Sequence, residues 1–187
     1  MSLSTIDCNS AKWAGNGSAV TSNPGQFDWF AVKVRTRAER TAGAFLSGRG
    51  YEVFCPTYLE RRTYADRIKT IESALFPGYL FCRLQWVSRL PVLSAPHVEY
   101  IVSFGREATP VNPAEVDAIR CAVDSGAKCR PHPFLRVGQR VRVRSGPLAS
   151  LEGVLIGSRG NHRLVISVEL LQRSIAAEVD SAFVRPL

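Results

Sequence analysis

The chain has 187 residues and a formal net charge of +8 at pH 7, with 45% hydrophobic and 21% charged residues. No apolar run approaches the roughly 18 residues that span a bilayer, and the first residues lack the basic and apolar segments of a signal peptide. We therefore expect a cytoplasmic protein with no membrane partner, built as one large domain or two small ones.

The charge is concentrated near the C-terminus. Residues 126–187 carry ten basic and four acidic groups, and nine of the ten are arginine, which suits bidentate binding of phosphate or carboxylate. This balance favours a polyanionic or acidic partner, whereas solvation alone is the plain alternative for any single arginine. The five cysteines are scattered, without a Cys-x-x-Cys motif or paired histidines. The sequence thus predicts no disulfide framework, no metal site and no cofactor.

The first 26 residues are rich in Ser, Asn, Gly and Thr, which predicts a disordered leader. Residues 29–35 alternate as a strand does, and residues 36–39 (Thr-Arg-Ala-Glu) fit a capping box for a helix that ends near Gly48 or Gly50. A second strand is expected at 51–56. This strand–helix–strand unit opens the predicted first domain.

The charged stretch 60–72 is expected to form an exposed β-hairpin with its tip near Ala65 and Asp66. A strand at 79–84, a short helix or turn within 86–93 and a strand at 100–104 follow. Asn112 and Pro113 then open a second helix that ends at Gly126. The order predicts an α/β sandwich over residues 27–126 and a linker over 127–133.

From Phe134 onward the pattern becomes all-β, with short strands expected near 140–144, 154–156, 164–168 and 174–178. This spacing suits a small five-stranded, SH3-like barrel over residues 134–187. The predicted fold class is therefore α+β, an α/β sandwich followed by a small all-β barrel.

Residues suited to catalysis are scarce. The three histidines, His97, His132 and His162, lie in expected loops or turns, and none belongs to a recognisable motif with a serine or cysteine nucleophile. Gly48-Arg49-Gly50 follows a helix and does not open one, so it is not a phosphate-binding loop. The sequence predicts that the protein is not an enzyme.

Aromatic residues gather around the stretch Leu75-Phe76-Pro77-Gly78-Tyr79-Leu80-Phe81. With period-2 alternation, Tyr79 and Phe81 lie on one face of their strand, and Leu80 and Cys82 lie on the other. One face would pack on the helices, and the other could form an apolar groove that stays accessible to a partner helix. The alternative is that these aromatic rings are simply part of the core.

Two basic clusters accompany these rings. Arg35, Arg37 and Arg40 lie at the end of the first strand and the start of the first helix, and we expect them to contact nucleic-acid phosphates. Further basic residues lie on the expected hairpin itself, namely Arg61, Arg62, Arg67 and Lys69. In the barrel, Arg140, Arg142 and Arg144 alternate with buried valines, and the loop after them carries Leu148 and Leu151, which we expect to be exposed.

These features resemble the NusG family of transcription elongation factors, especially specialised members of the RfaH and UpxY kind. The likeness runs from about Trp29 to Leu187. It depends on the Trp-Phe opening strand, Pro56 at the end of the second strand, the aromatic-proline stretch 75–81, Phe104-Gly105, and a KOW motif from Val137-Gly138 to Gly153-Val154. Ser150 stands where the KOW pattern commonly has glycine.

The resemblance implies an N-terminal NGN domain whose groove binds the clamp helices of the RNA polymerase β′ subunit and a second contact with the β subunit. Such bridging reduces pausing and gives elongation or antitermination activity. It implies that the polymerase-binding residues are Phe54, Phe76, Pro77, Tyr79 and Phe81. It also implies that Arg35 lies near non-template DNA or nascent RNA. The second contact, with the gate loop of the β subunit, would fall near residues 86–90.

The resemblance further implies that the KOW barrel recruits a ribosomal protein or the Rho factor through Arg142, Arg144, Leu148 and Leu151. We expect a monomer whose barrel keeps its β structure. The alternative from a different class is an RNA-binding KOW module of the ribosome or translation machinery. That alternative accounts for the basic barrel but leaves the aromatic-proline stretch without a role.

Overall fold

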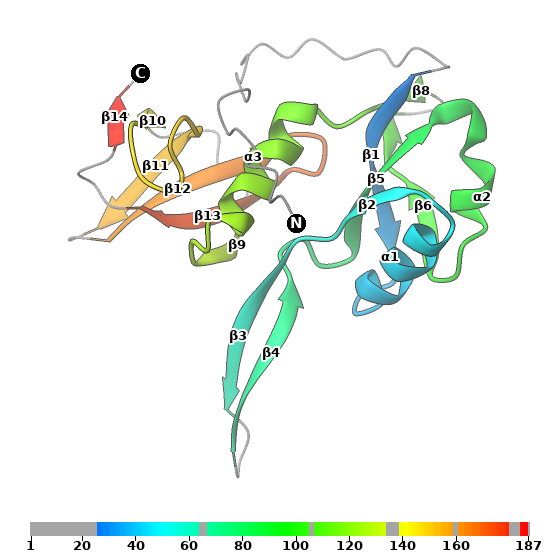
Figure 1. The fold of residues 1–187 in the computed structure, drawn as a ribbon, viewed down its shortest axis with the longest axis horizontal. Coiled ribbons are helices and arrows are strands. Elements are labelled where there is room, and N and C mark those ends of the chain that lie inside the picture. Colours follow the sequence, from blue (N-terminus) through cyan, green and yellow to red (C-terminus); the bar gives the residue numbers. More distant parts are fainter. Residues whose placement is uncertain are drawn as a thin grey trace, which may run out of the picture.

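A computed structural model describes residues 26–63, 67–104, 107–133, 139–158, 161–179 and 184–186. The leader predicted for residues 1–26 lies outside the described residues except for Gln26, and so does the predicted hairpin tip. In these ranges the chain forms two main β-sheets, a separate two-stranded ribbon and three α-helices, as Figure 1 shows. The predicted α+β class is confirmed.

The first sheet has four antiparallel strands in the order β2-β5-β1-β6. Their bounds are β1 Phe27–Val34, β2 Glu52–Phe54, β5 Tyr79–Gln85 and β6 Val98–Ile101. Strand β5 is central, with β1 and β2 on its two sides. The predicted strands at 29–35, 51–56 and 79–84 are confirmed. The last predicted strand of this domain, at 100–104, divides into β6 and β7 (Ser103–Phe104).

The two faces of this sheet are both covered, which the alternation of its residues explains. Helix α1 (Glu39–Gly48) and the short helix α2 (Leu90–Leu93) cover one face, where Phe30, Val32, Leu80 and Cys82 are fully buried. Helix α3 (Pro113–Asp124) covers the opposite face, which carries Trp29, Ala31 and Phe81. The aromatic rings of interest lie on this α3 face.

The two helix starts differ from each other in how they are capped. At α3 the Oδ1 atom of Asn112 accepts a hydrogen bond of 3.0 Å from the backbone N–H of Ala114, as predicted. The capping box predicted for residues 36–39 is wrong. The N-cap of α1 is Ala38, whose methyl side chain cannot accept a hydrogen bond, and Glu39 instead accepts one from the N–H of Gly78.

The predicted hairpin is the ribbon of β3 (Thr57–Thr63) and β4 (Ile68–Ala74), which reaches away from both sheets in Figure 1. Short elements connect the larger ones: the 3-10 turn Trp86–Ser88 (η2) and the pair β7 with β8 (Glu107–Ala108). The ribbon begins directly after β2 and ends directly before the aromatic-proline turn. The position of the ribbon and that of the turn are therefore linked.

The C-terminal sheet has six antiparallel strands in the order β14-β10-β11-β12-β13-β9. Their bounds are β9 Cys129–Pro133, β10 Gln139–Val143, β11 Glu152–Ser158, β12 Asn161–Val168, β13 Arg173–Val179 and β14 Val184–Pro186. The predicted strands match β10 to β13. Strand β9 lies inside the segment predicted to be a linker, and it pairs with β13 because this edge supplies free backbone partners.

Close packing inside the C-terminal sheet is visible at Gly153 of β11. A Cβ atom there would lie 2.6 Å from the backbone oxygen of Val165 and 3.0 Å from Cδ1 of Leu164. The backbone of β12 therefore approaches Gly153 too closely for any larger residue. By contrast, a Cβ at Gly48, the last residue of α1, would meet nothing within 4 Å.

We predict that Gly153→Ala lowers the free energy of unfolding by about 1–3 kcal/mol, because backbone must move to admit the methyl group. Gly48→Ala is the control and should leave stability unchanged or raise it by up to about 1 kcal/mol, since alanine favours helix. Urea denaturation followed by circular dichroism measures both. Equal effects of the two substitutions would contradict the packing described here.

Candidate functional site

The aromatic-proline turn, residues 75–79, is held at both ends by backbone bonds. The N–H of Leu75 donates to the carbonyl of Pro56 over 2.9 Å, and the N–H of Tyr79 donates to the carbonyl of Phe76 over 2.9 Å. Gly78 has a φ of +81°, which favours glycine, and its carbonyl accepts a 2.9 Å bond from the N–H of Val34. The turn is thereby tied to β1.

A buried carboxylate completes this attachment. Glu39, in the first turn of α1, is only 6% exposed, and its Oε1 atom accepts a 2.7 Å hydrogen bond from the N–H of Gly78. A charged acceptor makes this bond stronger than a neutral one. Glu39 therefore positions the turn against α1 from the opposite side of the sheet to the aromatic rings.

The predicted polymerase-binding rings form one stack on the α3 face. Phe76 and Phe81 meet edge to face with centroids 5.5 Å apart, and Phe54 lies 6.2 Å from Phe81 at an interplanar angle of 28°. The guanidinium of Arg120 in α3 lies over Phe54 at 5.2 Å and over Trp29 at 5.4 Å. The turn and three strands thus bring together residues that are distant in sequence.

This face is not open, contrary to the expectation of an accessible groove. Phe76 and Phe81 are 0% exposed, and one continuous cluster of buried residues joins them to α3 and to the C-terminal sheet. Figure 1 shows α3 lying between the two sheets. The aromatic face is buried because α3 and the C-terminal sheet cover it together. Pro77 is exposed, and Phe54 and Tyr79 are half-buried.

Tyr79 lies at the edge of the covered face, with two cations over its ring. Lys33 of β1 has its Nζ 5.0 Å from the ring centroid, and Arg173 of β13 has its Cζ 5.1 Å from the same centroid. Arg173 thus links the C-terminal sheet directly to the aromatic-proline turn. Such cation–ring contacts contribute about 0.5–2 kcal/mol each.

A second polar contact joins the two parts of the chain at the start of α3. Glu115 is 6% exposed, and its Oε1 accepts a 3.5 Å bond from the backbone N–H of Glu169, which follows β12. Burial raises the pKa of Glu115 to about 7; the bond from Glu169 opposes that rise, and the charge of Glu169 adds to it. Neutral Glu115 therefore suits the covered arrangement better than charged Glu115.

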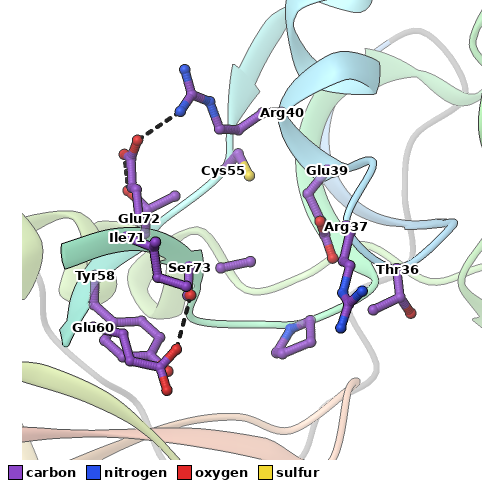
Figure 2. Close-up of a pocket in the computed structure, with 13 residues that line it drawn as sticks. Thr36, Arg37, Glu39, Arg40, Cys55, Tyr58, Glu60, Ile71, Glu72 and Ser73 are labelled. Carbon is purple, nitrogen blue, oxygen red and sulfur yellow. Dashed lines mark hydrogen bonds and ion pairs between the residues drawn. The ribbon is translucent and has the colours of Figure 1, made fainter. Parts of the chain in front are cut away.

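A cavity of about 540 Å³ lies beside the turn, between the start of α1 and the base of the ribbon. Figure 2 shows Thr36, Arg37 and Arg40 on its α1 side and Tyr58, Glu60, Glu72 and Ser73 on its ribbon side. Pro77 also lines it. The lining mixes both charges with hydroxyl groups, so the cavity is polar and is separate from the aromatic face.

The three predicted nucleic-acid contacts all lie at this end of the first sheet and are exposed. Arg37 and Arg40 line the cavity, and Arg35 lies two residues before Arg37 in the chain. Arg40 makes a 2.8 Å ion pair with Glu72, whereas Arg37 has no hydrogen bond or ion pair within the described part of the chain. Arg37 has a φ of +72°, an unusual backbone conformation for a side chain of this size.

The predicted partner-binding residues of the C-terminal sheet divide into two groups. Arg142 and Arg144 are exposed, and Arg142 is paired with Glu152 across β10 and β11. The expectation that Leu148 and Leu151 are exposed is wrong, since they are 5% and 1% exposed. The tight turn explains this, because Ser150 has a φ of +70° and its N–H donates to the carbonyl of Val143, which draws the loop inward.

The structure also limits what the site can do chemically. No group of histidine, cysteine and carboxylate side chains in the described ranges could hold a metal. Burial raises the pKa of the Cys55 thiol, which lines the cavity, to about 11, so it is a poor nucleophile. Cys121 is disulfide-bonded, which the scattered cysteines did not predict. No described helix is long and apolar enough to cross a membrane.

Comparisons with known proteins point in one direction. A sequence model of the family described as "Transcription termination factor nusG" matches residues 27–120. The NusG protein of Escherichia coli K12 is 31% identical over 134 residues, covering 69% of this chain and 74% of that protein. The NusG protein of Helicobacter pylori J99 is 24% identical over 165 residues, covering 81% and 94%.

The fold is also similar to a solved structure. The structure described as "Domain interaction in Thermotoga maritima NusG" matches with a TM-score of 0.52 at 19% identity, covering 88% of this chain and 99% of that one. At this level of identity the match supports the fold alone.

We predict that Glu39→Ala lowers the free energy of unfolding by about 1–3 kcal/mol, since the buried N–H of Gly78 loses its acceptor. Glu39→Gln keeps an acceptor oxygen and should cost less. Hydrogen exchange of the Gly78 amide, followed by NMR, measures the bond directly and should speed up most in Glu39→Ala. Unchanged exchange in that variant would show that Glu39 does not hold the turn.

The raised pKa of Glu115 gives a pH dependence with a definite sign. Its folded-state pKa of about 7 exceeds the ordinary 4.5, so its contribution is fully present below pH 4.5 and is lost as pH rises to about 7. Relative to Glu115→Gln, the wild type should therefore lose about 1–3 kcal/mol of stability over that window. Urea titrations at several pH values test this, and parallel curves for the two proteins would refute it.

Proposed function

This chain belongs to the NusG family of transcription termination/antitermination proteins, and we propose that it binds RNA polymerase through the aromatic face of its first sheet. Family members are transcription factors that work with RNA polymerase and are not enzymes, as the sequence predicted for this chain. The observation that supports this binding surface most strongly is the stack of Phe54, Phe76 and Phe81 beside the rigid turn. Pro77 and Tyr79 complete the proposed surface.

The proposed partner for this face is a pair of helices, the clamp helices of the polymerase β′ subunit. An apolar face with a polar edge suits the amphipathic side of such helices. A second contact with the β subunit near residues 86–90 would bridge the cleft, hold the clamp closed and reduce pausing. Val87 and Leu90 support that contact, since they are 57% and 69% exposed.

Because the C-terminal sheet and α3 cover the aromatic face, polymerase helices and the C-terminal sheet compete for it in this proposal. Polymerase binding then requires the C-terminal sheet to move away from the aromatic face. The apparent affinity for polymerase is the intrinsic affinity multiplied by the fraction of molecules in which the sheet has moved away. Arg173 and Glu169 mark the edge of the contact that must break. Once released, the C-terminal sheet is free to act on a second partner.

Two further contacts complete the proposal. Arg35, Arg37 and Arg40 contact phosphates of non-template DNA or nascent RNA, in keeping with their exposure and charge. The C-terminal sheet, as a KOW barrel, recruits a ribosomal protein or Rho. With Leu148 and Leu151 buried, the exposed Arg142 and Arg144 are left as the available part of that surface. The alternative of a ribosomal RNA-binding module leaves the aromatic stack unused.

We predict that Tyr79→Ala reduces capture of purified RNA polymerase several-fold when it is introduced into the Arg173→Glu background, where the contact of Tyr79 with the C-terminal sheet is already lost. Arg173→Glu removes the cation–ring contact that holds the C-terminal sheet, worth about 1 kcal/mol. It should therefore raise capture up to about fivefold. Pull-down with tagged full-length protein measures both. The control is Phe45→Ala, since Phe45 is also a half-buried aromatic under a cation, Arg49 at 4.3 Å, but it lies in α1 on the opposite face of the sheet.

Loss of capture in Phe45→Ala as well as in Tyr79→Ala would indicate a different surface. Capture that is equal with and without Tyr79→Ala in the Arg173→Glu background would contradict the proposed binding face. Tight binding to ribosomal RNA without affinity for polymerase would favour the alternative function.

A further inference from the structure

We propose that a cavity at the seam between the aromatic-proline turn and the C-terminal sheet binds a small organic anion, and that the bound anion holds the sheet on the aromatic face. This seam cavity has a volume of about 480 Å³. It is lined by Leu75, Pro77, Pro131, His132, Gln172, Arg173 and Ser174. The proposal rests on the proposed function in one respect only, which is the effect of the anion on polymerase binding.

The seam cavity has one wall on each part of the chain. Leu75 and Pro77 of the turn provide the first wall. The second wall comes from the C-terminal sheet, where β9 and β13 pair antiparallel with His132 opposite Ser174. A molecule that touches both walls can therefore bind only while the C-terminal sheet lies against the turn.

Hydrogen bonds within each wall fix its shape. The turn is anchored by its backbone bonds to β1 and to the end of β2. On the sheet side, Ser174 is 2% exposed and its hydroxyl oxygen lies 2.8 Å from that of Ser167. The side-chain N–H of Gln172 donates to the carbonyl of Glu169 over 2.6 Å. A pocket that is already formed loses less conformational entropy when it takes up a ligand.

The charge of the lining has one sign. None of the seven described residues that line the seam cavity is acidic, and Arg173 carries a positive charge. Its guanidinium lies over the ring of Tyr79 but makes no hydrogen bond or ion pair within the described ranges, so its N–H donors are available. A guanidinium binds carboxylate or phosphate through two parallel hydrogen bonds. The seam cavity therefore favours an anion over a cation.

Apolar groups in the lining determine which kind of anion fits. Leu75, Pro77 and Pro131 add carbon surface beside the cation. An inorganic ion would leave this surface in contact with water, whereas an organic anion would bury it, which is favourable. The volume lies within the usual range for small-molecule sites, about 300–1,000 Å³. The expected ligand is thus a compact apolar body, such as an aromatic ring, that carries one carboxylate or phosphate.

Such a ligand acts on polymerase binding through the cover. Since it contacts both walls, it binds the covered form and stabilises that form by mass action. At a ligand concentration ten times its dissociation constant, the ratio of covered to open molecules rises about elevenfold. Polymerase capture falls by a similar factor when most molecules are already covered.

The binding test uses the full-length protein and two anionic probes, benzoate and phenyl phosphate, at constant ionic strength. Benzamide is the neutral control of similar shape. The NMR chemical shift of the Ser174 backbone amide follows each titration. Gln172→Lys adds a cation to the lining and should tighten the binding of both anions up to about fivefold, and Gln172→Glu should weaken it by a similar factor.

Arg163→Gln is the matched control variant, because it removes the same unit of charge as Gln172→Glu. Arg163 is exposed and lies at the other end of the sheet, since it pairs with Glu178 whereas Arg173 pairs with Val168. It does not line the seam cavity, so Arg163→Gln should leave the affinity unchanged.

Tighter binding of one anion than of the other supports the site and identifies its anionic group. Benzamide binding as tight as that of the anions would overturn the proposal. So would equal effects of Gln172→Glu and Arg163→Gln, or no shift at Ser174 with either anion.

The effect on the cover is tested by polymerase capture with and without a saturating amount of the tighter anion. Capture should fall in the wild type and stay unchanged in Arg173→Gln, which lacks the cation. Anion binding without a fall in capture would overturn the claim that the anion holds the sheet in place. If polymerase is not captured under any condition, the proposed function fails, but the titration contains no polymerase and its result still stands.

Discussion

Burial of one apolar sheet face is the constraint on which the rest of the structure depends. Two fully buried rings, Phe76 and Phe81, form a single core with α3 and the C-terminal sheet. Large aromatic side chains dominate the free energy of such interfaces, so this face must be covered by something whenever the protein is folded in water. A transcription factor that binds its partner with this face must therefore exchange one cover for another. Polar contacts lie at the edge of the cover and are made by Arg173 and Glu115. A change in the charge of either side chain would alter how strongly the C-terminal sheet is held on the aromatic face.

The turn that carries Phe76 is held by hydrogen bonds to β1 and α1, and these bonds do not involve the C-terminal sheet. Gly78 is held by Val34 on one side and by the buried carboxylate of Glu39 on the other. Helix α1, which provides Glu39, also provides Arg40 to fix the base of the ribbon. One helix thus contacts both the turn beside the proposed polymerase-binding face and the ribbon, and a preorganised surface loses less conformational entropy on binding.

Alternation and capping signals predicted most of the fold because they act locally. Val32, Val141 and Asn112 each lie where the period of their strand or the chemistry of a helix start requires. What could not be predicted depends on contacts between distant segments. Glu39 was assigned to a capping box because the sequence does not show Gly78 beside it, and Leu148 was expected at the surface because the inward turn at Ser150 depends on a φ of +70°. No signal in the sequence indicates that the C-terminal sheet covers the aromatic face. The sequence also does not distinguish Glu115, Arg120 and Arg173, at the edges of that cover, from solvated charges.

The measurement that tests this account most directly is the distance between the two sheets in solution, with and without RNA polymerase. Fluorophores at Ser47 of α1 and Arg130 of β9, both exposed, report this distance by single-molecule energy transfer. The account predicts one narrow distribution for the free protein and a second, altered distance when polymerase is saturating. A broad distribution in the free protein, or an unchanged one in the polymerase complex, would contradict the claim that the C-terminal sheet and polymerase share one face.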